Sequence, residues 1–125
     1  MKELIFAELG YKINGIAFKV DNLLGYGHSE KVYSSAFEEL LKKESLEYKR
    51  ELYWPIMIDG KVIAKRYFDF LVDNKIIIEI KTGNYQFRNA CQQLFQYLRA
   101  SNYKLGLIVR FSKNGVQIKR VVNLL

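Results

Sequence analysis

The fold is decided by two neighbouring stretches of the chain, RYFDFLV at residues 66–72 and IIIEIK at residues 76–81. Side chains along a strand alternate between its two faces, so each stretch presents an apolar face and a second face that carries acids. Only residues 73–75 separate the two stretches, and hairpin loops of two or three residues are both common. The stretches therefore predict two antiparallel strands whose register depends on the loop.

The two registers differ in what they place opposite Asp69. A two-residue loop would place Asp69 opposite Ile78 and would break the apolar face. A three-residue loop pairs Phe70 with Ile78, keeps that face continuous and sets Asp69 directly across from Glu79. We therefore expect the pairs Phe68–Ile80, Phe70–Ile78 and Val72–Ile76, with Phe68, Phe70 and Val72 on one face.

Two opposed carboxylates about 4.5–5.5 Å apart repel, so one must stay protonated or a cation must lie between them. Lys81 follows on the same face and supplies one positive charge. Mg²⁺ or Mn²⁺ would supply more, and the Ile80 carbonyl would add a hard oxygen ligand. Alternatively, Glu79 and Lys81 line an exposed face with Asp69 at its margin. Because Ile76–Ile78 is apolar on both faces, as in a covered strand, the metal site is favoured.

Glu30 adds a third carboxylate. It shares a helical stripe with Tyr33, Phe37 and Leu41, so it is expected to point toward the core side at the start of a helix. It would complete the metal shell or hold a water there. An acid in the first turn of a helix is also favoured by the helix dipole alone, and spacing does not separate the two explanations.

Gln93 and Tyr97 are four residues apart and therefore share one face of a predicted helix. Neutral donors beside a metal would orient a phosphate or a water. A polar helix edge is the alternative, and it would be preferred without the strand motif.

The remaining sequence predicts the order α-α-β-β-β-α-β-β. The parallel strand–helix–strand unit from Ile76 to Phe111 should be a right-handed crossover, whereas the earlier strands form a meander. The fold class is therefore α/β (α+β mixed), with a mixed central sheet flanked by helices. The expected helices cover 8–24, 29–45 and 85–101, and the expected strands cover 48–58, 61–72, 76–81, 103–111 and 116–122. Ser29 is the expected helix N-cap, Gly25 a helix end, Asp59-Gly60 a hairpin turn, and Pro55 a sign of an edge strand or bulge.

Length and composition narrow the class of protein. With 125 residues, we expect one domain over 1–125. One cysteine and one histidine cannot build a thiolate or imidazole zinc site. No apolar run reaches the roughly 18 residues that span a bilayer, and Glu3 and Glu8 interrupt any signal-peptide pattern. These observations predict a cytoplasmic protein without a membrane partner.

The charge is uneven along the chain. The net charge is +7, and residues 75–125 contain nine basic side chains and one acid, Glu79. A basic half suggests an anionic partner, most commonly nucleic acid, although a solubilising surface is the alternative. Such residues would follow a phosphate backbone without reading its sequence. They are Arg88, Arg99, Lys104, Arg110, Lys113, Lys119 and Arg120.

Three motifs resemble those of a known family. Asp69 followed by Glu79-Ile80-Lys81 resembles the D…(D/E)-x-K signature of the PD-(D/E)XK nuclease superfamily, and QLFQY at 93–97 resembles the Q-x-x-x-Y helix of its RecB-like branch. GHSEKVY at 27–33 reads as G-x-x-E-x-x-Y, the pattern of the GxxExxY proteins. The resemblance covers about residues 13–123. Phe68 departs from it, because it replaces the proline of the superfamily name.

The resemblance implies a restriction-endonuclease-like αβββαβ core and a Mg²⁺- or Mn²⁺-dependent nuclease acting on DNA, less so on RNA. It assigns metal binding to Glu30, Asp69 and Glu79. It assigns Lys81 to the attacking water or the scissile phosphate, and Gln93 and Tyr97 to support of the active site. The alternative is a catalytically inactive nucleic-acid-binding or assembly subunit. A homodimer would suit the cutting of two strands.

Overall fold

The computed structural model describes residues 5–84 and 86–124, and within them the predicted order of elements is confirmed. The predicted start of the third helix at residue 85 lies outside the described residues. No helix in the described ranges is long and apolar enough to cross a membrane. The elements are α1 (Ala7–Leu24), α2 (Glu30–Lys43), β1 (Tyr48–Ile58), β2 (Lys61–Val72), β3 (Ile76–Thr82), α3 (Phe87–Ser101), β4 (Leu105–Ser112) and β5 (Gly115–Val122).

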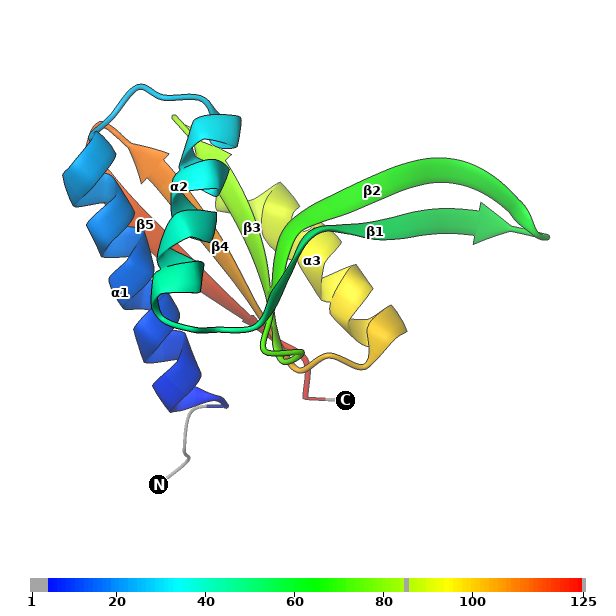
Figure 1. Ribbon diagram of the computed structural model, residues 1–125. Helices are drawn as coiled ribbons and strands as arrows, with labels where there is room; N and C mark the ends of the chain where they lie inside the picture. Colours follow the sequence, from blue (N-terminus) through cyan, green and yellow to red (C-terminus); the bar gives the residue numbers. More distant parts are fainter. Residues whose placement is uncertain (1–4, 85, 125) are drawn as a thin grey trace.

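The five strands form one mixed sheet in the order β1-β2-β3-β4-β5. β3 and β4 run parallel, as predicted, and the other neighbours are antiparallel. α1 and α2 pack on one face of the sheet and α3 packs on the other (Figure 1). β3 is consequently covered on both faces, which explains its continuous isoleucine run.

The predicted register between β2 and β3 is confirmed only at one end. Val72 pairs with Ile76 and Phe70 with Ile78, but the ladder stops there. The expected pairing of Phe68 with Ile80 is wrong, and so is the expected common face, because Phe68 packs in the α3 cluster whereas Phe70 packs under α2.

The change of face has a local cause. Across from Asp69, Glu51 of β1 adopts a left-handed backbone with φ 61°, which interrupts the regular alternation. From that point β1 and β2 leave the sheet together as a two-stranded ribbon (Figure 1). We call residues 53–67 the arm.

The predicted caps and turns are confirmed. The Ser29 hydroxyl accepts a hydrogen bond from Val32 N–H at 3.3 Å, and Gly25 follows α1 with φ 71°. Asp59 and Gly60 both have positive φ, as a tight hairpin turn between twisted strands requires. Pro55 lies in the edge strand β1.

Gly106 of β4 is where α3 approaches the sheet most closely. A Cβ atom placed there would lie 2.4 Å from Leu94 Cδ2. We expect Gly106→Ala to reduce the free energy of unfolding by about 1–3 kcal/mol, because Leu94 and its helix must shift. Urea denaturation measures this loss. Gly15→Ala in α1 is the matched control, since nothing lies within 4 Å of a Cβ there; equal effects at the two glycines would contradict the packing.

Candidate active site

Two carboxyl groups meet where the arm separates from β3. Asp69 Oδ2 accepts a hydrogen bond from the backbone N–H of Ile80 at 2.6 Å. The Asp69 side chain also hydrogen-bonds the carboxyl group of Glu79, the residue that precedes Ile80 in β3. The backbone ladder between β2 and β3 ends at Phe70, and beyond it the Asp69 side chain takes the place of a backbone partner for Ile80. This hydrogen bond fixes the Asp69 carboxylate beside Glu79.

The pKa of Glu79 is unusually high, and burial is the main cause. Burial, followed by the hydrogen bond and the negative charge of Asp69, raises the pKa of Glu79 to about 10. Lys81 opposes the shift, and Glu30 adds a little to it. At neutral pH the pair therefore holds one proton on Glu79, which donates to the Asp69 carboxylate. This is the outcome expected for two opposed carboxylates without a cation.

The Ile80 carbonyl faces the same gap. In a strand, the N–H and C=O of one residue point to the same edge. Because Ile80 N–H points to Asp69, the carbonyl of Ile80 is directed to the edge that β2 has left.

Glu30 lies at the mouth of the site. It is the first residue of α2 and is exposed, and Tyr33, one turn later, is the first buried residue of that stripe. Glu30 nevertheless lines a surface hollow of about 360 Å³ together with Asp69. The sequence did not indicate the other residues that line it, which are Lys31, Ser34, Arg50 and Glu51.

Tyr33 explains how α2 is held against the end of the sheet. Its ring stacks on Phe111 with centroids 4.2 Å apart, and its hydroxyl donates to the Gly25 carbonyl at 2.5 Å. The loop that contains His28 is thereby tied to the first turn of α2. In the G-x-x-E-x-x-Y segment, the contacts of Tyr33 therefore fix the start of α2, where Glu30 lies.

Tyr33→Phe keeps the stack on Phe111 but removes the hydroxyl. We expect it to lower the free energy of unfolding by about 1 kcal/mol, because the Gly25 carbonyl loses its donor. A chemical denaturation curve measures this. Tyr11→Phe, at an exposed tyrosine of α1, is the control and should leave the curve unchanged; the account of the loop fails if the two variants behave alike.

Lys81 and Arg110 lie side by side at the end of the sheet. They are register partners on β3 and β4, and they share the α3 face with Glu79. The Arg110 guanidinium lies 4.3 Å from the ring centroid of Phe87 at the start of α3, and its Nη2 donates to Gln117 Oε1. Lys81 therefore lies next to the carboxyl pair, and Arg110 lies beside Lys81 on the adjacent strand.

Gln93 and Tyr97 project from α3 toward this face of the sheet. Tyr97 is buried, and its ring contacts Phe68 and Trp54 at centroid distances of 4.8 and 5.0 Å. Gln93 is half-buried one turn earlier. Tyr97 thus packs against the residue that precedes Asp69 and against the base of the arm.

The basic residues of the C-terminal half do not form one surface. Arg88, Arg110 and Lys113 belong to the end of the sheet where β3 and β4 terminate. Arg99 and Lys104 lie at the opposite end, between α3 and β4. Arg120 is half-buried on the α1 face, where its Nη2 donates to the Ile5 carbonyl at 3.2 Å, and Lys119 is exposed on the other face of β5.

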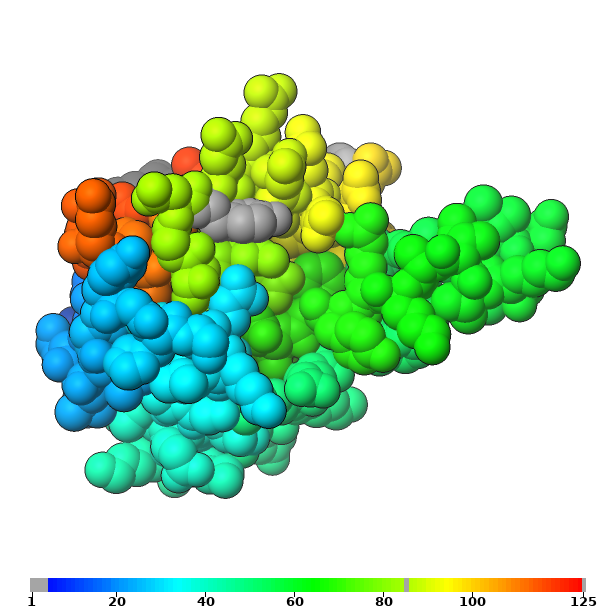
Figure 2. All heavy atoms as spheres, turned by 90° about the horizontal axis from the view of Figure 1, so that it is seen from above, coloured from blue at the N-terminus to red at the C-terminus, as the bar shows by residue number. Residues whose placement is uncertain are grey.

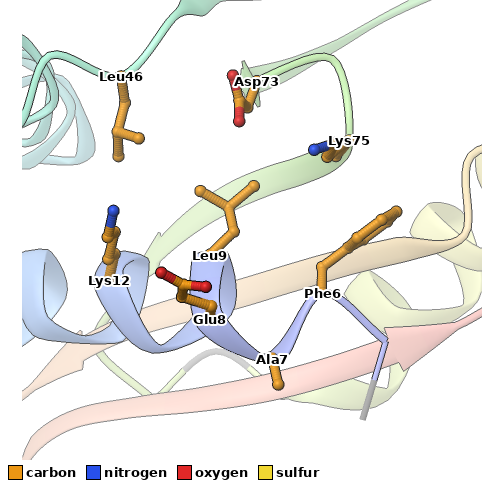
Figure 3. Close-up of a pocket in the computed structure, with 8 residues that line it drawn as sticks. All are labelled: Phe6, Ala7, Glu8, Leu9, Lys12, Leu46, Asp73 and Lys75. Carbon is orange, nitrogen blue, oxygen red and sulfur yellow. The ribbon is translucent and has the colours of Figure 1, made fainter. Parts of the chain in front are cut away.

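A larger hollow, of about 750 Å³, lies at the other end of β3 between α1 and the β2–β3 turn (Figure 3). Acidic and basic side chains from the two elements, Glu8, Lys12, Asp73 and Lys75, line it together with apolar ones. None of the candidate site residues lines it.

The donor set fits a divalent cation. Among the described residues, no group of three or more His, Cys, Asp and Glu side chains is already gathered for a metal ion. Asp69 and Glu79 do touch, the pair holds a proton where a cation would relieve the repulsion, and the Ile80 carbonyl faces them. These are hard oxygen ligands, which Mg²⁺ and Mn²⁺ prefer.

The fold and the paired acids beside a lysine define a nuclease-like α/β protein. The chain belongs to the PD-(D/E)XK nuclease superfamily, whose sequence profile matches residues 7–121. The crystal structure of SSO0001 is similar, with a TM-score of 0.57 and 22% sequence identity over 95% of this chain. The matched part is 60% of the SSO0001 chain, and at that identity the likeness concerns the fold alone. No curated protein sequence matches the chain.

Proposed function

We propose that the protein is a Mg²⁺- or Mn²⁺-dependent nuclease that hydrolyses phosphodiester bonds in DNA, as one catalytic domain acting in the cytoplasm. The observation that carries the proposal is the contact between Asp69 and Glu79, with Lys81 on the same face of β3. Superfamily membership supports nuclease activity in general. The G-x-x-E-x-x-Y segment and the Q-x-x-x-Y helix support a place among the GxxExxY proteins of the RecB-like branch.

The cation would be held by Asp69, Glu79 and the Ile80 carbonyl, with Glu30 reaching it directly or through a water. Bound there, it would neutralise charge on the scissile phosphate and acidify the attacking water. The proton that Glu79 holds would leave when the cation binds, because both carboxylates must then be ionised.

Lys81 is proposed to position the attacking water and to offset the negative charge that develops on the phosphate. Its ammonium is near enough to Glu79 to lower the pKa of that carboxyl group, so it acts at the same point in space. Arg110, on the adjacent strand, would hold a phosphate next to the one that is cut. The stack on Phe87 keeps its guanidinium directed to this end of the sheet. Gln93 is proposed to support the site from α3, and Tyr97 to do so by packing behind Asp69.

The test is a cleavage assay with plasmid DNA, single-stranded DNA and RNA in Mg²⁺, Mn²⁺ or EDTA. The proposal predicts cleavage of DNA with either metal and none in EDTA. Salt-dependent binding without cleavage under any metal would contradict it and would favour an inactive nucleic-acid-binding subunit instead.

A further inference from the structure

The arm, residues 53–67, is the most exposed feature of the molecule. It projects from the body in two perpendicular views (Figures 1 and 2). Four large apolar side chains around its tip are about half exposed, Met57, Ile58, Val62 and Ile63, with values from 47 to 58%. Because neighbouring side chains in a strand alternate, these apolar groups lie on both faces of the ribbon near its tip, and this much exposed apolar surface on a projecting element indicates a site of interaction.

The charge of the arm indicates the chemistry of the partner. The arm contains three basic residues, Lys61, Lys65 and Arg66, and one acid, Asp59. The whole chain has a net charge of +7, so two copies would bring like charges together at this surface. A polyanion would be attracted to it.

The shape of the arm also fits a polyanion of a particular kind. A two-stranded β-ribbon is narrow enough to enter the major groove of a duplex, which is about 12 Å wide. Apolar side chains can contact the thymine methyl groups that line that groove, and basic residues beside them contact the phosphates. Tyr53 and Tyr67, with ring centroids 5.1 Å apart, add an exposed aromatic pair nearer the base of the arm.

The base of the arm is tied to the candidate active site. Asp69 lies two residues beyond the arm in β2, and Trp54 anchors the arm against Tyr97 of α3. A polymer held along the arm is therefore brought to the carboxyl pair. We infer that the arm is a duplex-binding element that enters a groove of double-stranded nucleic acid and guides the backbone to the site. This inference rests on the proposed function for the role of the site, but not for the binding itself.

The experiment measures binding by fluorescence anisotropy in EDTA, where no cleavage occurs, with a labelled 30-base-pair duplex and a single strand of the same length. Lys61→Ala/Lys65→Ala should weaken duplex binding about 10-fold or more and reduce the salt slope by about 2, one contact for each lysine. Ile58→Ser/Ile63→Ser should weaken duplex binding and leave single-strand binding within twofold. The control Lys42→Ala/Lys43→Ala removes the same charge from exposed positions at the end of α2 and should change neither.

Circular dichroism melting verifies that each variant is folded. Duplex binding by the arm variants equal to that of the wild type overturns the inference. So does a dimer in sedimentation that becomes a monomer in the Ile58→Ser/Ile63→Ser variant, because the partner would then be a second copy. If the arm variants lose duplex binding and the wild-type protein cleaves no substrate, the duplex-binding role of the arm is supported and the proposed nuclease activity is rejected. If the arm variants cleave duplex DNA at the wild-type rate, the duplex-binding role of the arm is rejected, whereas the proposed nuclease activity stands.

Discussion

Replacing Glu79 by glutamine is expected to stabilise the metal-free protein increasingly as the pH rises, while abolishing cleavage. In the folded chain the pKa of Glu79 is raised to about 10, chiefly by burial, whereas an unfolded chain has the usual value of 4.5. Glutamine has nearly the same shape and still donates a hydrogen bond to Asp69, but it requires no proton to do so.

The direction of the pH effect follows from proton counts. Below the usual pKa both states are protonated, so Glu79 leaves stability unchanged. Between that value and about 10 the unfolded state ionises while the folded state keeps its proton, so the wild type loses stability as the pH rises. The loss is about 1.4 kcal/mol per pH unit for one group. The variant lacks this loss, because glutamine does not ionise.

Urea unfolding in EDTA at several values between pH 5.5 and pH 8.5 (roughly the window in which the two states differ) measures this difference. The unfolding free energy of Glu79→Gln minus that of the wild type should increase steadily with pH. The matched control is Glu39→Gln at an exposed acid of α2, whose difference from the wild type should stay flat. Parallel curves for Glu79→Gln and the wild type would mean that Glu79 is ionised, and the described carboxyl pair would be wrong.

Lys81→Met is expected to reduce kcat for DNA cleavage about 10²–10⁴-fold, the range for a group that positions a nucleophile or stabilises developing charge. Methionine keeps most of the length of the side chain and removes the ammonium. Steady-state cleavage of a labelled duplex in Mg²⁺ measures kcat and KM separately.

The matched control for Lys81→Met is Lys75→Met, just before the other end of β3, which should cleave at the wild-type rate. KM should change much less than kcat in Lys81→Met, because one cation among many contributes little to binding of the backbone. A variant with full kcat and a raised KM would show that Lys81 only binds substrate, and its proposed role would have to be given up.

The parts of the fold that follow from local chemistry could be predicted from the sequence. The order of elements, the β2–β3 register near Val72 and the parallel pairing of β3 with β4 depend on alternation, turn residues and continuous apolar runs. Asp69 and Glu79 were expected to meet for the same reason, and they do.

The missed features depend on contacts that alternation does not encode. Phe68 lies on the opposite face from the expected one, just beyond the point where Glu51 of the neighbouring strand takes a left-handed conformation. Nothing in the sequence around Glu51 indicates that its backbone is left-handed. Glu30 shares a stripe with buried residues, but it is the first residue of the helix and is itself exposed. Arg120 looked like a surface cation, yet α1 folds over it.

The most direct test of the account is a crystal structure of the protein grown with saturating Mn²⁺, with the ion located by anomalous scattering. We expect one ion between Asp69 and Glu79, coordinated by an oxygen of each, with the Ile80 carbonyl as a further ligand. An empty gap in which the two carboxyl groups still share a proton, or a gap filled by the Lys81 amine, would contradict it.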